Sequence, residues 1–120
     1  MSAKDNLKEQ VEKVVTKFTD EHMQVSPRSV VVDIHTDCVL ATLQDMIPPA
    51  EKNCADGAQS RELLEKCYSN VFDNTKKGLE RELGNILGQS VGNSMLTVDL
   101  QSGNGVMIFN FAGRASAQGR

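Results

Sequence analysis

The sequence predicts an α+β domain in which an antiparallel four-stranded sheet packs against a long helix and an N-terminal helix. Two stretches have the apolar spacing of amphipathic helices, and two others are rich in β-branched residues and broken by short polar turns. The elements follow in the order α-β-β-α-β-β. A length of 120 residues suits one hydrophobic core, so we expect a single domain over residues 4–112. Residues 113–120 lack apolar periodicity and are expected to form a disordered tail.

The first predicted helix runs from Lys4 to Met23. Its apolar residues recur every three or four positions, which aligns them along one side of a helix, and charged residues fill the other sides. Ser26 and Pro27 should end it, because proline disfavours a helical conformation in the residue before it and has no N–H to donate. The apolar stripe consists of Leu7, Val11, Val14, Val15 and Phe18.

A β-hairpin is predicted over residues 30–43. This stretch is rich in β-branched residues, and the polar residues 35–37 in its middle are typical of a tight turn between two strands. Pro48 and Pro49 should end the second strand. A short helix can begin at Ala50, because proline is well tolerated in a first helical turn.

The long helix is predicted over residues 60–87, with Gly88 placed to end it in a left-handed conformation. Such a helix would extend about 40 Å, whereas strands of about six to eight residues span only about 20–27 Å. The helix should therefore extend beyond its own sheet. Because an exposed apolar stripe needs a cover, either the helix breaks near Gly78 or Gly84, or a second chain packs against it. The stripe contains Leu64, Cys67, Tyr68, Val71, Phe72, Thr75, Leu79, Leu83, Ile86 and Leu87.

A second hairpin is predicted from residues 94–100 and 106–111. Its turn at residues 102–105 contains glycine and asparagine, which tolerate positive φ angles. Alternation along the strands places apolar residues on both faces of the sheet, and this pattern, like the overlong helix, favours self-association over a stable monomer. One face would carry Val30, Val32, Ile34, Leu96, Val98, Leu100, Met107, Phe109 and Phe111, and the other Val31, Leu40, Met95, Val106 and Ile108.

The composition of the chain argues against a protein that binds nucleic acid or spans a membrane. The chain has 13 Lys and Arg residues against 16 Asp and Glu residues, a net charge of -3, so no overall positive field attracts nucleic acid. The N-terminus lacks the pattern of a signal peptide, and no apolar run approaches the roughly 20 residues of a transmembrane helix. We expect a cytoplasmic protein that does not bind nucleic acid and has no transmembrane segment of its own.

The three cysteines, Cys38, Cys54 and Cys67, show neither disulfide nor zinc-binding spacing and are interpreted as free thiols. Cys38 and Cys67 occupy strand and helix positions compatible with burial, which is common for free cysteine. Cys54 lies in a loop-like segment. A redox role there would need a positive neighbour such as Lys52 to stabilise the thiolate.

Asp33, His35 and Asp37 form the sharpest local feature that could carry chemistry. At alternate positions of an extended strand their side chains point the same way, and imidazole with two carboxylates is a plausible metal-binding set. Alternate polar residues are also what the solvent-facing side of a half-buried strand looks like, and Asp37 belongs to the turn. We favour this second interpretation, and we predict no metal, no cofactor, no catalytic residue and no enzymatic activity.

The run Leu-Gln-Asp-Met-Ile-Pro-Pro-Ala-Glu-Lys at residues 43–52 closes the first hairpin and opens the helical half. It resembles the Thr-Pro-Ala-Glu-Lys signature of the MpsC-like proteins, also known as the YbcI family, with Pro48 in place of the usual threonine. The resemblance covers roughly residues 5–112. It includes Ser-Pro-Arg-Ser-Val at residues 26–30 and Ser-Arg-Glu-Leu-Leu at residues 60–64.

The resemblance implies a domain that accompanies the membrane subunits of a sodium-translocating, membrane-potential-generating system connected with inorganic-carbon supply. The chain is then expected to be a non-enzymatic interaction or regulatory module, homodimeric, in the cytoplasm or at the inner face of the membrane. The rival hypothesis is a sensor that binds a small molecule or an anion. The candidate contacts for a ligand or partner are Pro49, Glu51 and Lys52 of the signature, together with Arg28 and Arg61.

Overall fold

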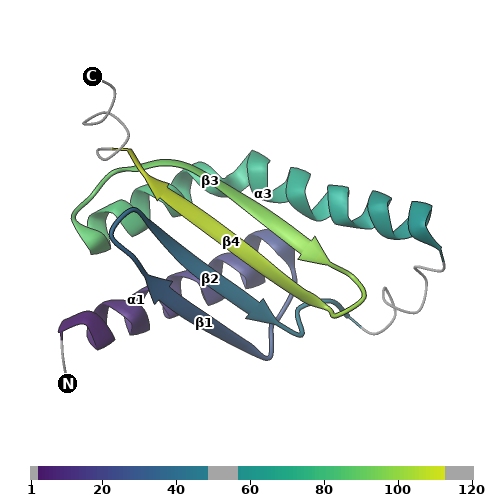
Figure 1. The fold of residues 1–120 in the computed structure, drawn as a ribbon, viewed down its shortest axis with the longest axis horizontal. Helices are drawn as coiled ribbons and strands as arrows, with labels where there is room; N and C mark the ends of the chain where they lie inside the picture. The colour runs from purple at the N-terminus through teal and green to yellow at the C-terminus, as the bar shows by residue number, and fades with distance from the viewer. Residues whose placement is uncertain (1–2, 49–56, 113–120) are drawn as a thin grey trace.

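The computed structural model describes residues 3–48 and 57–112 and confirms the predicted α+β class (Figure 1). The predictions of a helix from Ala50 and of a tail over residues 113–120 lie outside these residues. Within them, the elements follow the predicted order. Their bounds are α1 Ala3–Phe18, the π-helical turn η1 Thr19–Met23, β1 Ser29–Ile34, β2 Cys38–Gln44, α3 Ala58–Leu87, β3 Val91–Asp99 and β4 Asn104–Phe111.

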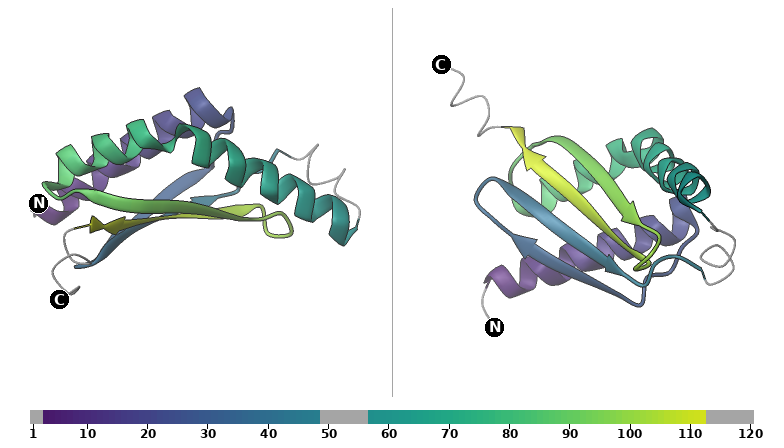
Figure 2. Two further views of the ribbon diagram at one scale, coloured as in Figure 1. Left: turned by 90° about the horizontal axis from the view of Figure 1, so that it is seen from above. Right: turned by 45° about the vertical axis from the view of Figure 1, so that its right-hand side comes forward.

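The four strands form one antiparallel sheet in the order β1-β2-β4-β3. Val32 lies opposite Ala41, Ala41 opposite Met107, and Met107 opposite Leu96, so a row of apolar side chains crosses the sheet. Figure 2 shows α1 and α3 on the same face of the sheet. α1 packs against β1 and α3, while α3 packs against β3. The domain therefore has two layers, with its core between them.

Three phenylalanines join the two layers. Phe72 of α3 is fully buried, and its ring lies 5.8 Å from that of Phe18 in α1 and 6.4 Å from that of Phe109 in β4, measured between centroids. Both pairs have the edge-to-face geometry that the aromatic quadrupole favours, which contributes about 0.5–1.5 kcal/mol per pair beyond burial. This contact holds both helices on the sheet.

The first helical segment ends at Met23, as predicted, three residues before Ser26 and Pro27. Gln24 takes a left-handed conformation with φ 56°, and its N–H donates to the carbonyl of Thr19. Thr19 itself is fully buried, and its hydroxyl donates to the carbonyl of Thr16 at 2.8 Å. The turn brings Val25 into the core at 4% exposure, just before Ser26 and Pro27.

The long helix is continuous, which removes one of the two alternatives that the sequence left open. α3 runs through Gly78 and Gly84 without a break and ends at Gly88, whose φ is 72° and whose N–H donates to the carbonyl of Gly84 at 2.8 Å. Its N-terminal end extends past the sheet and past α1 (Figure 2). Leu63, in this half of the helix, is 61% exposed.

The prediction that Cys67 is buried was wrong, and Cys38 is only half-buried. Cys67 lies one turn after Leu63 on a side of α3 that no described helix covers, because α1 and η1 end at Met23. Cys38 begins β2 on the sheet face that points away from both helices. The apolar stripe predicted for this helix therefore includes residues that α3 leaves exposed, among them Cys67.

Replacing Phe72 by alanine should lower the free energy of unfolding by about 3–5 kcal/mol, because it leaves a cavity between both helices and the sheet. The matched control is Val71→Ala at the neighbouring residue, which is 38% exposed and should cost less than about 1 kcal/mol. Urea denaturation of the two variants measures both values. Equal losses would show that Phe72 is not the centre of the core.

Replacing Gly78 by alanine should raise the free energy of unfolding by about 0.5–1 kcal/mol, since the new methyl group meets no atom within 4 Å and alanine favours helix. The contrasting variant is Gly105→Ala, whose methyl group would lie 2.6 Å from the Met46 sulfur and should lower stability. Thermal unfolding of both chains checks the two signs. A loss of stability at Gly78 would mean that the helix is not regular there.

Candidate functional site

The residues of the predicted contact site do not converge in the part of the chain that the structure describes. Arg28 is exposed and pairs with the carboxylate of Asp45 at 3.9 Å, a surface ion pair that contributes little to stability. Arg61 is half-buried in the first turn of α3, where its N–H donates to the carbonyl of Gly57 at 3.1 Å. The other three contacts predicted from the signature, Pro49, Glu51 and Lys52, lie outside the described residues, as does Cys54.

Asp33, His35 and Asp37 are all exposed. Asp33 belongs to β1, whereas the other two residues form the hairpin turn: the N–H of His35 donates to the carbonyl of Cys38 at 2.8 Å, and the carbonyl of Asp37 accepts from Phe111 at 3.0 Å. Over residues 3–48 and 57–112, no three His, Cys, Asp or Glu side chains are grouped so that they could hold a metal ion. Asp33 therefore lies on the exposed face of β1, and His35 and Asp37 belong to the turn that follows this strand.

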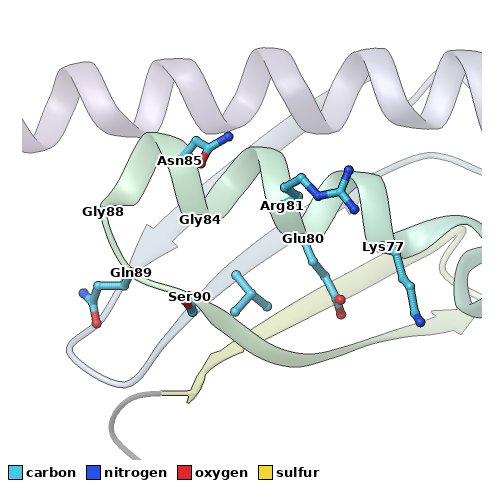
Figure 3. A pocket seen from close by; sticks show the side chains of 9 residues that line it. Lys77, Glu80, Arg81, Gly84, Asn85, Gly88, Gln89 and Ser90 are labelled. Atoms are coloured by element: carbon cyan, nitrogen blue, oxygen red, sulfur yellow. The ribbon is translucent and has the colours of Figure 1, made fainter.

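A hollow of about 450 Å³ lies between the C-terminal half of α3 and the residues that lead into β3 (Figure 3). Lys77 and Glu80 extend from α3 toward β3 in this view. The Glu80 carboxylate accepts a hydrogen bond from the buried hydroxyl of Ser94 at 2.5 Å, so this carboxylate serves the packing of helix on strand. The hollow is lined by Lys77, Glu80, Arg81, Gly84, Asn85, Gly88, Gln89, Ser90 and Val91.

The charges of this hollow do not favour an anion. Lys77 and Arg81 bring positive charge, but Glu80 lies between them in the sequence and faces the same space. The C-terminus of α3 is also close, and the carbonyl groups at a helix C-terminus repel negative charge. The hollow lies far along α3 from Arg61, so it does not join the residues that the sensor hypothesis named.

Side chains of α3 cover part of the outer edge of β3. The Lys76 ammonium donates to the carbonyl of Ser94 at 2.7 Å, and the Ser69 hydroxyl donates to the carbonyl of Leu96 at 3.0 Å. Just beyond the strand, the N–H of Leu100 donates to the Glu65 carboxylate at 3.1 Å. Strand edges present unpaired backbone groups that other strands can bind, and covering the edge with a helix prevents this. α3 therefore covers part of the outer edge of β3.

The sequence did not identify these three side chains of α3. Glu65, Ser69 and Lys76 follow one another at spacings of four and seven residues, which places them on one flank of the helix beside the buried stripe. Polar residues with this spacing normally belong to a solvent-facing side. Only the position of β3 shows that they face backbone groups.

The sheet face that points away from the helices is apolar at its centre, as the alternation predicts. Leu40 lies opposite Ile108, and Ile108 opposite Met95, so one apolar row crosses three strands. Met95 is 52% exposed and Val31 is 42% exposed. We refer to Val31, Leu40, Met95, Val106 and Ile108 as the outer sheet face. Its central positions carry no charge, and the acidic residues Asp33 and Asp99 lie toward its margins.

A second apolar surface lies on α3. Leu63, Cys67 and Val71 are exposed at intervals of four residues, which aligns them on one side of the helix. We refer to them as the α3 stripe. Beside it is a groove of about 270 Å³ between α3 and the turn after η1. The groove is lined by Met23, Gln24, Val25, Leu64, Cys67, Tyr68 and Val71.

Replacing Ser69 by alanine should lower the free energy of unfolding by about 1 kcal/mol, because the carbonyl of Leu96 loses its donor at the strand edge. The control is Asn70→Ala at the next position, which is exposed and should leave stability unchanged or slightly higher. Chemical denaturation of the two variants measures both free energies of unfolding. A Ser69 variant as stable as the Asn70 variant would mean that α3 does not hold this edge.

One protein-family model matches the chain over residues 3–113, and its description reads Na+-translocating membrane potential-generating system (MpsC). No curated protein and no solved structure matches the chain. Among the described residues, no helix is both long enough and apolar enough to cross a membrane.

Proposed function

Because the chain belongs to the MpsC family, whose name refers to a Na+-translocating membrane system, we propose that it is a non-enzymatic interaction module of such a system. It acts as a homodimer on the cytoplasmic side of the membrane, where it binds a subunit that moves sodium ions or inorganic carbon. The outer sheet face is the surface that binds this subunit. Binding there regulates or assembles the system without chemistry in this chain.

The observation that carries the proposal is the one-sided packing of the domain. Both described helices cover one face of the sheet, while the opposite face exposes a row of apolar side chains across three strands (Figure 2). Exposed apolar surface at the centre of a sheet is costly in water and is typical of a surface that binds a protein. Val31 and Met95 are the most exposed members of the face and would be buried on binding.

Charge supports a protein as the partner rather than a lipid surface. The two acidic side chains at the margin of the outer sheet face, Asp33 and Asp99, would repel the anionic headgroups of a membrane. They suit an apolar protein patch bordered by lysine or arginine. Glu80, Lys76 and Ser69 form hydrogen bonds to β3, so these polar side chains serve the packing of α3 on the sheet.

The proposal predicts that Met95→Glu abolishes capture of the membrane subunits of the Na+-translocating system. A tagged chain is expressed in its native cells, the membrane fraction is solubilised, and the captured subunits are identified by mass spectrometry. Met95 is exposed, so the new charge leaves the fold intact but must be desolvated at an interface. At least tenfold less subunit should be recovered, a loss of about 1.4 kcal/mol or more in binding.

The matched control is Leu63→Glu, which places the same charge on the exposed α3 stripe instead. This variant should capture the subunits as well as the unchanged chain does. Equal capture by the Met95 and Leu63 variants would contradict the assignment of the outer sheet face. Failure of the unchanged chain to capture any subunit of the system would contradict the proposed function itself.

A further inference from the structure

The hydrogen bonds between β1 and β2 show which backbone groups of β1 face β2 and which point away from the sheet. The N–H of His35 donates to the carbonyl of Cys38, which fixes residue 35 as facing β2. Residues of an antiparallel strand alternate between facing their partner and facing away. The backbone groups of Val30, Val32 and Ile34 therefore point out of the sheet. β1 is an edge strand, so these three N–H groups and three carbonyl groups lie at the margin of the sheet.

The two edges of the sheet differ in how many of their outward backbone groups are bonded by side chains. Along β3, Lys76 and Ser69 of α3 bind the outward carbonyl groups of Ser94 and Leu96, and the strand has an irregular register at its start. Along β1, no side chain of the described residues forms a hydrogen bond to the outward groups, and the register with β2 is regular. Natural proteins blunt exposed edges with bulges, proline or charged side chains; β1 contains no bulge, proline or lysine, and its one charged residue is Asp33. The edge of β3 is partly bonded by α3, whereas the outward groups of β1 have no bond from a side chain of the described residues.

We infer that two copies of the chain pair through β1, antiparallel and edge to edge, so that their sheets form one continuous eight-stranded sheet. The inference rests on the homodimer of the proposed function and assigns its interface. A two-fold axis normal to the sheet passes beside Val32, which lies opposite Val32 of the second copy. Val30 of each copy then lies opposite Ile34 of the other, and Val31 opposite Asp33.

The side chains of β1 suit a second copy of this chain. Val32 is buried, whereas Val30 and Ile34 are only partly covered by the core. In the pairing they cover each other across the axis, so the apolar layer continues from one sheet into the next. On the other face each Asp33 meets a valine rather than the second Asp33, and no like charges lie directly opposite. The strand is therefore complementary to itself.

The helices also permit the pairing. α1 lies on the same face of the sheet as α3 and packs against β1 (Figure 2). The two-fold axis places the two α1 helices antiparallel on one face of the joined sheet. The groove between α1 and the residues that lead into β1, about 470 Å³ in volume, carries charges of both signs. Its charged side chains are Glu12, Lys13, Lys17 and Asp20.

Hydrogen exchange of named amides tests the pairing, measured by NMR on the full chain at several protein concentrations. The amides of Val30, Val32 and Ile34 are bonded only in the dimer, and at 100 times the dimer dissociation constant they should exchange about tenfold more slowly than in the monomer. The amides of Val31 and Asp33 bond to β2 within one chain and serve as internal controls, whose exchange should not depend on concentration.

A proline at the outward edge provides a second test. Val30→Pro removes one outward N–H without touching the bonds to β2, and proline is tolerated at a free sheet edge. Sedimentation should show a monomer for this variant, with the far-ultraviolet circular dichroism of the unchanged chain. Val30→Thr keeps the N–H and nearly the same shape, so it should remain a dimer.

The outcomes separate this inference from the proposed function. A dimer whose three outward amides are protected supports the β1 pairing. A dimer in which these amides exchange as fast as in the monomer, or that survives Val30→Pro, overturns the pairing and leaves the homodimer standing. A chain that stays monomeric at hundreds of micromolar overturns both the pairing and the homodimer, while capture of the membrane subunits is decided by the Met95 variant.

Discussion

The packing of Phe72 between Phe18 and Phe109 is the interaction on which the architecture depends. It joins α1 and α3 to the same face of the sheet. In this arrangement α3 packs against β3, and Ser69 and Lys76 donate to carbonyl groups of that strand. The aromatic core and the partly covered edge of β3 therefore depend on the same helix.

One-sided packing also decides what remains uncovered. A two-layer domain with a single four-stranded sheet has one bare sheet face and two edges, and here α3 covers part of only one of those edges. The outer sheet face and β1 are therefore separate surfaces. In the proposed assembly, β1 bonds to a second copy in the plane of the sheet, while the outer sheet face presents apolar side chains perpendicular to it. The two proposed contacts do not compete for the same surface.

The sequence predicted the elements well because each has a strong local signal. The β-branched residues before and after the polar turn gave the first hairpin, and Gly88 gave the end of α3 from its tolerance of a left-handed conformation. The exposure of Cys67 could not be predicted in this way. Periodicity shows which side of a helix is apolar, whereas burial depends on whether another element lies there, and α1 ends before it reaches this part of α3.

Much less of the candidate site was predictable. Alternation along the strands identified the outer sheet face, since facing is set by the geometry of a strand. Ser69 and Lys76 were missed because their partners are carbonyl groups of β3, which no side-chain pattern can reveal. Arg28 and Arg61 were named because their positive charges could hold an anion, and charge carries no information about whether two side chains meet. The openness of β1 needed the strand order, which the sequence left undefined.

The strand order also has a consequence for how the chain folds. The hairpins β1–β2 and β3–β4 each join neighbouring segments, but the seam between β2 and β4 joins Leu43 to Gly105 across the whole of α3. Contacts between residues far apart in the sequence form slowly, because the intervening chain must first lose conformational entropy. Closing this central seam is therefore expected to limit the folding rate. Until it closes, each hairpin exposes a strand edge that the finished domain conceals.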